Sequence, residues 1–237
     1  MAITAAILTQ GGTNVNATSF TTASVTLEAN RLALLAVCAG QVDTITVPTI
    51  TGLGATWVQA TSRNFNVIAS PDNRILVFRT MVASQQVGTV LIDYGASSMN
   101  NCAWTLAEFA GVDTSGTNGS GAIVQAVSPA ATDAATSYSA TLLAFGDAVN
   151  NAAYFVAAHT SVDAITLEAG YTTLGNQNMT ETAPGTHLRA EWKLGEDLSP
   201  SLTTASNRAW GGGALEIKMA AAASSTPFYS GWRRRAA

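Results

Sequence analysis

SFTTASVTLEANRLALLAVCAGQVDTITVPTITGLGATWVQ (19–59) and SYSATLLAFGDAVNNAAYFVAAHTSVDAITLEAGYTTLGNQ (137–177) are two stretches of one chain that match each other in order. Phe20 corresponds to Tyr138, and the apolar segment ALLAVCAG corresponds to YFVAAHTS. Matched segments in a fixed order are typical of an internal duplication. The chain is therefore predicted to contain one β-rich unit twice.

The match continues beyond these two stretches. RILVFRTMV (74–82) corresponds to THLRAEWKL (186–194), and NNCAWTLAEF (100–109) corresponds to SNRAWGGGALEI (206–217). The segment VSPAATDAATS lies between the two copies and has the small residues and the proline of a boundary. The predicted organisation is therefore a first repeat, a second repeat and an extended C-terminal tail, over residues 1–127, 128–219 and 220–237.

The pattern of short apolar runs indicates an all-β fold. Runs rich in Val, Ile, Leu, Thr and aromatic residues are separated by clusters of Gly, Asn, Asp and Pro, and no segment keeps a helical period. We expect an antiparallel, jelly-roll-like β-sandwich with at most a single helical turn. The expected strands are 22–27, 31–39, 55–62, 74–82, 87–94, 102–110, 138–144, 152–160, 170–175, 186–194, 200–205 and 213–219.

The two copies differ in how their strands alternate. In THLRAEWKL, Leu188 and Ala190 share one face while His187 and Glu191 share the other, which predicts one dry and one wet face. In the first copy, LALLAVCA (32–39) is apolar on both faces. Such a strand is covered on both sides. We expect the second cover to be either the second repeat or another subunit.

The composition restricts the class of protein. Charged residues make up 11% of the chain and hydrophobic residues 47%, so the surface is formed largely by small and polar side chains. This is common where a surface is occupied by partners or copies, although a secreted protein has the same composition. The net charge of −4, with nine arginines and two lysines, predicts no broad nucleic-acid surface. The N-terminal residues do not form a signal peptide, and no apolar run predicts a membrane span.

The residue types that carry catalysis or bind metals are sparse. His159 and His187 have no partner at a metal-ligand spacing, so we interpret both as surface or edge residues. Cys38 and Cys102 lie in apolar strand patterns and are interpreted as buried free thiols, with a disulfide as the alternative. The sequence thus predicts no metal and no cofactor.

A pair of matched carboxylates raises the possibility of an enzyme. Glu108 and Glu216 correspond between the copies, and two carboxylates in a sandwich are the machinery of a glycosidase. Both alternate outward from Phe109 and Ile217, so we interpret them as duplicated surface positions. No catalytic residue is assigned, and the chain is predicted not to be an enzyme.

Aromatic residues suggest a second class, a carbohydrate-binding module or adhesin, in which exposed rings stack on sugars. The matched Trp104 and Trp210 are expected to belong to the core instead. The four candidates for such a platform are Trp57, Trp104, Trp192 and Trp210.

The C-terminal segment departs from the strand pattern. A spacer of small residues, AAAASST, is followed by PFYSGWRRRAA, which combines three aromatic residues with three arginines. Aromatic side chains fill pockets and arginine makes bidentate contacts, so this composition favours a docking peptide over an idle tail. The predicted partner-binding residues are Phe228, Tyr229, Trp232, Arg233, Arg234 and Arg235.

ANRLALLAVCAG, ITGLGATWVQ, RILVFRTMV and CAWTLAEFAGVDTSGTNGSGAIVQ together resemble a β-rich module of tailed-bacteriophage virion proteins, over roughly residues 25–127. The resemblance implies a capsid- or tail-associated structural protein with no catalytic residues, made in the host cytoplasm and located in the virion.

The hypothesis that follows is a non-enzymatic virion protein. Its most direct form is a capsid decoration (cement) protein that forms homo-oligomers and docks on other virion structural proteins through its C-terminal tail. The alternatives are a tail or fibre component, or the carbohydrate-binding adhesin.

Overall fold

The computed structural model describes residues 2–41, 45–66, 72–179 and 185–221. In this part of the chain the protein is all-β, with one 3₁₀ turn at Ser120–Ala122, as the sequence predicted. The strands are β1 (Thr4–Thr13), β2 (Ser19–Thr21), β3 (Val25–Leu27), β4 (Leu32–Gln41), β5 (Thr49–Gly52), β6 (Val58–Phe65), β7 (Asp72–Thr80), β8 (Gln86–Gly88), β9 (Val90–Asp93), β10 (Asn101–Ala110), β11 (Ile123–Val127), β12 (Thr132–Ser139), β13 (Ala152–His159), β14 (Thr172–Met179), β15 (Thr186–Leu194) and β16 (Ser201–Ile217).

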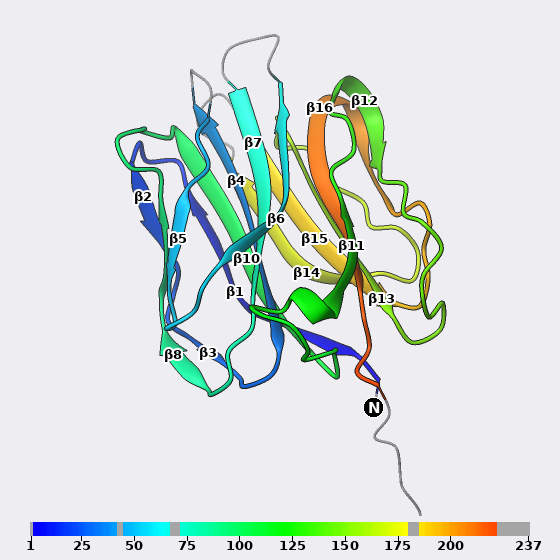
Figure 1. Cartoon of the computed structure of the whole chain (residues 1–237). Helices are drawn as coiled ribbons and strands as arrows, with labels where there is room; N and C mark the ends of the chain where they lie inside the picture. The colour runs from blue at the N-terminus through cyan, green and yellow to red at the C-terminus, as the bar shows by residue number, and fades with distance from the viewer. Residues whose placement is uncertain (1, 42–44, 67–71, 180–184, 222–237) are drawn as a thin grey trace, which may run out of the picture.

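Two large antiparallel sheets form the sandwich (Figure 1). The first sheet has the order β1-β10-β4-β7-β6, and the second has the order β11-β16-β13-β15-β14 with β12 added along β16. The sheets face each other so that β10 lies over β14, and β16 lies over β6. Each half of the chain thus contributes one layer of a single sandwich.

The two sheets have equivalent strands in the same order, with β1 matching β11, β10 matching β16, β4 matching β13, β7 matching β15 and β6 matching β14. Even an irregularity is shared: β6 has a bulge between Gln59 and Thr61, and β14 has one between Thr173 and Gly175. These bulges lie opposite Phe78 and Glu191 at equivalent points of the neighbouring strands. The equivalent order agrees with the predicted duplication, whose evolutionary origin stays an interpretation.

Strand registers correct the sequence match by one residue. Ala33 pairs with Glu108, and Ala153 pairs with Glu216, so Ala33 corresponds to Ala153. The match of ALLAVCAG with YFVAAHTS places Ala33 against Tyr154 and is therefore wrong. Because side chains alternate along a strand, a shift of one residue exchanges the faces. Ala33 indeed lies on the outer face of its sheet and Tyr154 on the inner face.

The inner faces form the main core. Leu34 and Val77 of the first sheet pack with Tyr154, Val156 and Leu215 of the second, and all five are buried. The apolar strand at 32–39 is covered on both sides, as predicted. The cover over its inner face is the second sheet, so this cover comes from the same chain.

The outer face of the first sheet is covered by two small sheets, β2-β9-β5 and β3-β8. Phe20, Leu53 and Ile92 from these segments pack on Leu76 and Phe78. The outer face of the second sheet is covered by connecting segments instead. These segments contribute a second apolar cluster, which includes Tyr138, Leu142, Phe145, Ile165 and Tyr171.

Two sequence-based boundaries are wrong. β11 pairs with β16, so residues 123–127 belong to the second sheet rather than to the first repeat. The strands expected at 200–205 and 213–219 are one continuous strand of 17 residues, β16, which pairs first with β12 and then with β13 and β11. The glycines in SNRAWGGGALEI resemble a break. They are tolerated because Tyr138 and Thr61 approach too closely for a side chain at Gly212 and Gly213.

Candidate functional site

The outer face of β15 is polar, in contrast to its equivalent in the first sheet. His187, Arg189, Glu191 and Lys193 point outward there, and β7 carries Arg74, Leu76, Phe78 and Thr80 at the equivalent positions. The alternation predicted a wet face at this place. That prediction is wrong, because the chain between β13 and β14 covers this face and buries His187 and Glu191.

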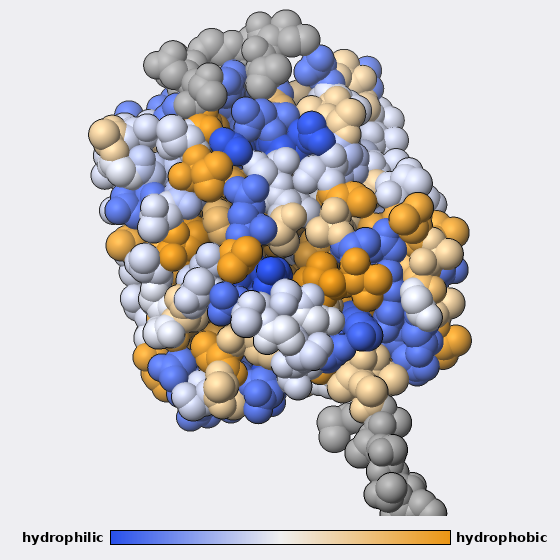
Figure 2. All heavy atoms as spheres, in the orientation of Figure 1, coloured by the Kyte–Doolittle hydropathy of each residue, from blue (hydrophilic) through white to orange (hydrophobic). Residues whose placement is uncertain are grey.

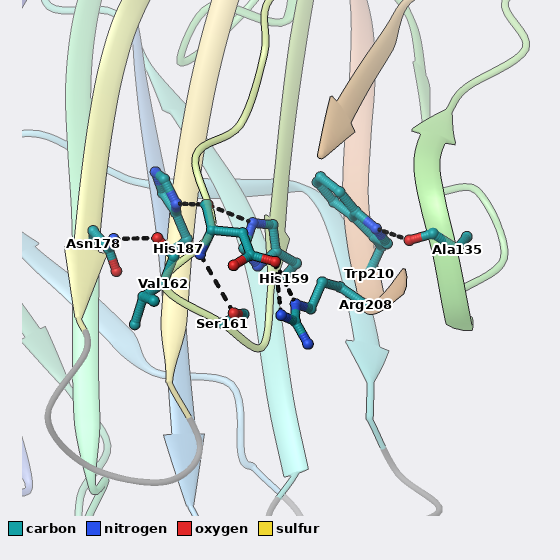
Figure 3. A network of polar contacts seen from close by, with 9 residues as sticks. Ala135, His159, Ser161, Val162, Asn178, His187, Arg208 and Trp210 are labelled. Carbon is teal, nitrogen blue, oxygen red and sulfur yellow. Dashed lines mark hydrogen bonds and ion pairs between the residues drawn. The ribbon is translucent and has the colours of Figure 1, made fainter. Parts of the chain in front are cut away.

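The two histidines form a pair under this covering segment (Figure 3). The rings of His159 and His187 lie 5.3 Å apart, and both are buried, so the prediction of surface positions is wrong. His159 Nε2 and His187 Nδ1 lie 3.1 and 2.7 Å from the same oxygen, the carbonyl of Asp163. A carbonyl only accepts hydrogen bonds, so both nitrogens must carry hydrogen. The two imidazoles thereby hold the 160–165 segment against the sheet.

The surroundings favour a neutral His159. Burial, together with the neighbouring His187, lowers the pKa of His159 to about 4. The ring of His159 also packs against Trp210, whose Nε1 donates to the carbonyl of Ala135. The carboxylate of Asp163 points to Arg208, with which it forms an ion pair of 2.7 Å. Each polar group thus serves to join the covering segments to the sheet.

A buried carboxylate lies further along β15. The side chain of Glu191 is fully buried, and neither of its oxygens has a hydrogen-bond partner. Burial raises the pKa of Glu191 to about 8, and the nearby Arg189 offsets only part of that effect. A raised pKa is one mark of a catalytic acid. Here, however, the group lines neither the hollow at the end of the second sheet nor the smaller one at the end of the first sheet.

The matched glutamates are structural. Glu216 accepts hydrogen bonds from the backbone of Gly146 and from the side chains of Asn151 and Gln125, at 2.6–2.9 Å. Glu108 accepts from Arg31 and from the backbone of Glu28. Both carboxylates point outward from their sheets, as predicted, but both are buried, so the prediction of surface positions is wrong. Each one fixes the segment that leads into the central strand of its own sheet.

An open hollow of about 620 Å³ lies at the end of the second sheet, where the described chain ends. We call it the C-terminal pocket. Its walls come from the start of β11 with Ile123 and Val124, from the turn before β13 with Asp147, and from Met219 to Ala221 after β16. A bulge in β11 between Ile123 and Gln125 leaves Val124 unpaired and directs it outward. Figure 2 shows apolar residues beside β11 on this face.

The polar groups of the C-terminal pocket are already engaged. The Asn151 side chain bonds to Glu216 and to the backbone of Met219. Lys218 pairs with Asp113 at 2.7 Å. The carboxylate of Asp147 accepts from the backbone of Val149 and Asn150, and these bonds, together with one from the Asn150 side chain, lower its pKa. What the pocket offers a ligand is therefore apolar surface and the negative charge of Asp147.

Exposed apolar side chains flank the C-terminal pocket. Leu143, which exchanges backbone bonds with the Gln125 side chain beside Val124, is 77% exposed, and Val149 is 72% exposed. Val124 itself is 48% exposed. Large exposed apolar groups near a hollow are one feature of interaction surfaces.

The four candidate tryptophans and the two cysteines lie in or against the apolar clusters. Trp104 and Trp210 are buried, as predicted, although the registers match Trp210 with Cys102 rather than with Trp104. Trp57 and Trp192 pack against the clusters of the first sheet and the main core. Cys38 and Cys102 are buried free thiols, as predicted. The six predicted docking residues lie outside the described residues: Phe228, Tyr229, Trp232, Arg233, Arg234 and Arg235.

Within the described ranges, no group of three or more His, Cys, Asp or Glu side chains could hold a metal ion. None of the helical structure in the same ranges has the length and apolar character to span a membrane. The chain matches no family model, no curated protein and no solved structure. Its function therefore has to be argued from its own residues.

Proposed function

We propose that this protein is a non-enzymatic structural component of a tailed-phage virion, in the first place a capsid decoration protein. One observation carries the proposal: the C-terminal pocket is an open feature of the described residues that is largely apolar, has most of its polar groups engaged and lies beside Leu143 and Val149. A surface of this kind recognises a protein by shape and apolar contact.

The buried carboxylates and histidines support the same interpretation. Glu108, Glu216, His159 and His187 are each used to fix a covering segment to a sheet. Their buried positions favour a rigid scaffold over a reaction centre. A small share of charged residues suits such a scaffold when partners occupy its surface.

The experiment is quantitative mass spectrometry of gradient-purified particles from cells that produce the phage and this chain. A decoration protein is expected at a copy number comparable with that of the major capsid protein. A few copies per particle would replace this assignment with the tail or fibre alternative. Absence from intact particles would overturn the virion proposal in both forms.

A chain without the C-terminal segment provides a second test. A chain that ends at Ala221 is expected to be lost from the particles, because the aromatic and arginine residues then no longer anchor it. Normal incorporation of the shortened chain would show that anchoring uses another surface.

A further inference from the structure

We infer that the C-terminal pocket of one copy binds the aromatic–arginine segment 228–235 of a second copy, so that two copies associate by exchanging these segments. The inference rests on the proposed function, since it names the first partner of the pocket as the protein itself. It follows from where the described chain ends, how far the remaining chain reaches and which chemistry the pocket offers.

The position of the chain end is the first argument. Ala220 and Ala221 form part of the pocket wall, so every copy carries its own C-terminal segment directly from the rim of its own pocket. Six residues, 222–227, separate that wall from Phe228. An extended chain of this length spans about 20 Å. Two copies that meet rim to rim can therefore reach each other's pockets.

The sequence of the connecting residues favours the second copy over the chain's own pocket. Residues 222–227 read AASSTP. They contain no Gly, Asn or Asp, the residues that most readily adopt the positive-φ backbone of the tightest reversals. The residue before a proline is biased to extended backbone, and Thr226 stands before Pro227.

The chemistry of the pocket matches this segment. Phe228, Tyr229 and Trp232 are large apolar groups, and the pocket presents Val124 and Met219 with its polar groups already engaged. A hollow of about 620 Å³ lies within the usual range for pockets that hold ligands. Such aromatic anchors in a preformed hollow are the residues that dominate binding at protein interfaces.

The charges match as well. Residues 1–232 contain eight Lys and Arg side chains against fifteen Asp and Glu, and hence carry a formal charge of −7, whereas Arg233–Arg235 carry +3. The carboxylate of Asp147 in the pocket is ionised and lies at the rim where an arginine would follow the aromatic residues. A second copy supplies both the segment and the opposite charge. Reciprocal exchange of identical segments closes as a symmetric dimer.

The test is sedimentation analysis of the purified full-length protein over a concentration series. The wild type is expected to form a dimer. A full-length variant with Phe228, Tyr229 and Trp232 all replaced by Ser, and separately the pocket variant Val149→Asp, are each expected to weaken dimerisation at least tenfold. The matched control is Val87→Asp on β8. Val87 is 69% exposed, close to the 72% of Val149, but it lies in the small sheets that cover the first sheet. This control is expected to dimerise like the wild type.

A mixing experiment identifies the two surfaces as partners. The triple-serine variant retains an intact pocket, and the variant Val124→Asp, Val149→Asp retains an intact segment. Each is expected to be monomeric alone, and their mixture is expected to recover a dimer through one exchange. No recovery on mixing, a monomeric wild type at every concentration, or a dimer that ignores all these changes would each overturn the inference.

These outcomes separate the inference from the proposed function. Dimerisation is measured without particles, and presence in particles is measured without reference to dimerisation. A dimer that behaves as expected while the chain is absent from particles refutes only the virion proposal. A chain that is abundant in particles but monomeric refutes only the exchange of segments.

Discussion

β7 and β15 occupy equivalent places in the two sheets, yet their outer faces have opposite character. β7 presents Leu76 and Phe78 to an apolar cover made by two small sheets, and β15 presents Arg189 and Glu191 to a cover made by connecting segments. The inner faces, by contrast, are apolar in both sheets. The requirement for apolar side chains therefore holds on the faces through which the two sheets pack together. Each outer face has the polarity of the segments that cover it.

The ends of the two sheets differ for a related reason. After β10 the chain continues over the end of the first sheet, where Arg79 donates to the carbonyls of Thr117 and Asn118 and leaves only a small hollow of about 140 Å³. After β16 the described chain ends at Ala221, and the larger C-terminal pocket lies there. The larger hollow thus lies at the end of the second sheet, and the smaller one lies at the end that residues 114–119 cover.

The strongest test of the comparison exchanges the character of the two outer faces. Phe78→Glu places a carboxylate in an apolar cluster with no partner, and we expect a loss of more than 4 kcal/mol of unfolding free energy or a failure to fold. Glu191→Leu at the equivalent position removes an unpartnered carboxylate, and we expect stability at pH 8 to be unchanged or increased. Urea unfolding measures both.

Phe78→Leu serves as the control, with an expected cost of about 1 kcal/mol from the smaller side chain. If Phe78→Glu were as stable as this control, the two outer faces would be equivalent in polarity and the comparison would fail.

A second test compares the matched glutamates. Glu216 is fully buried and accepts three hydrogen bonds, so Glu216→Ala leaves the buried donor of Asn151 unpaired and removes the bonds from Gly146 and Gln125, at an expected cost of about 3 kcal/mol. Glu108 is bonded to Arg31, whose side chain is 38% exposed and can be solvated instead, so Glu108→Ala is expected to cost about 1 kcal/mol. Equal costs in chemical denaturation would contradict this difference between the two sheets.

The third prediction concerns stability between about pH 4.5 and pH 8. Because burial raises the pKa of Glu191 to about 8 from its ordinary value of 4.5, the unfolded chain releases this proton at lower pH than the folded protein does. Stability is therefore expected to fall as the pH rises from about 4.5 to 8. Glu191→Gln should flatten this part of the profile in thermal unfolding, whereas Glu28→Gln, at a partly exposed position of the first half, should leave it in place. A variant that kept the wild-type slope would contradict the buried, protonated state of Glu191.

The smallest effect is expected on the acidic side. Burial lowers the pKa of His159 to about 4, so the unfolded chain takes up a proton between pH 6.5 and 4 and the folded protein does not. This contribution makes stability fall as the pH decreases through that window, in the opposite direction to the Glu191 effect. His159→Gln should reduce it, and adding His187→Gln should reduce it further, since burial also lowers the pKa of His187. An NMR titration that placed His159 above pH 6 would contradict this account.

Much of the fold could be predicted from local patterns. Alternating and continuous apolar runs identified the central strands β4, β7, β10, β13 and β15 to within a few residues. Strands with weak patterns were missed, including β1. Its sequence, TAAILTQGGT, has few large apolar residues because the strand lies at a sheet edge. The length of β16 was missed because glycine normally interrupts a strand, and only the close approach of Thr61 and Tyr138 explains why glycine is required there.

The candidate site could be predicted only in part. Alternation correctly assigned His187 and Glu191 to the face opposite Leu188 and Ala190, but alternation says nothing about whether that face is covered. The C-terminal pocket was missed altogether. Its walls come from residues 120–124, 146–151 and 218–221, which are brought together only by the pairing of β11 with β16. The sequence did indicate the aromatic–arginine segment, because that signal is one of local composition.

The sequence by itself determined the all-β class, the antiparallel pairing and the apolar inner faces, because these depend on a side-chain period of two that neighbouring residues set. The tertiary structure decided which outer faces are dry, which carboxylates are buried and where a pocket opens. These properties depend on contacts between separate segments of the chain, such as Glu216 with Gly146 and Asn151, and folding creates these contacts.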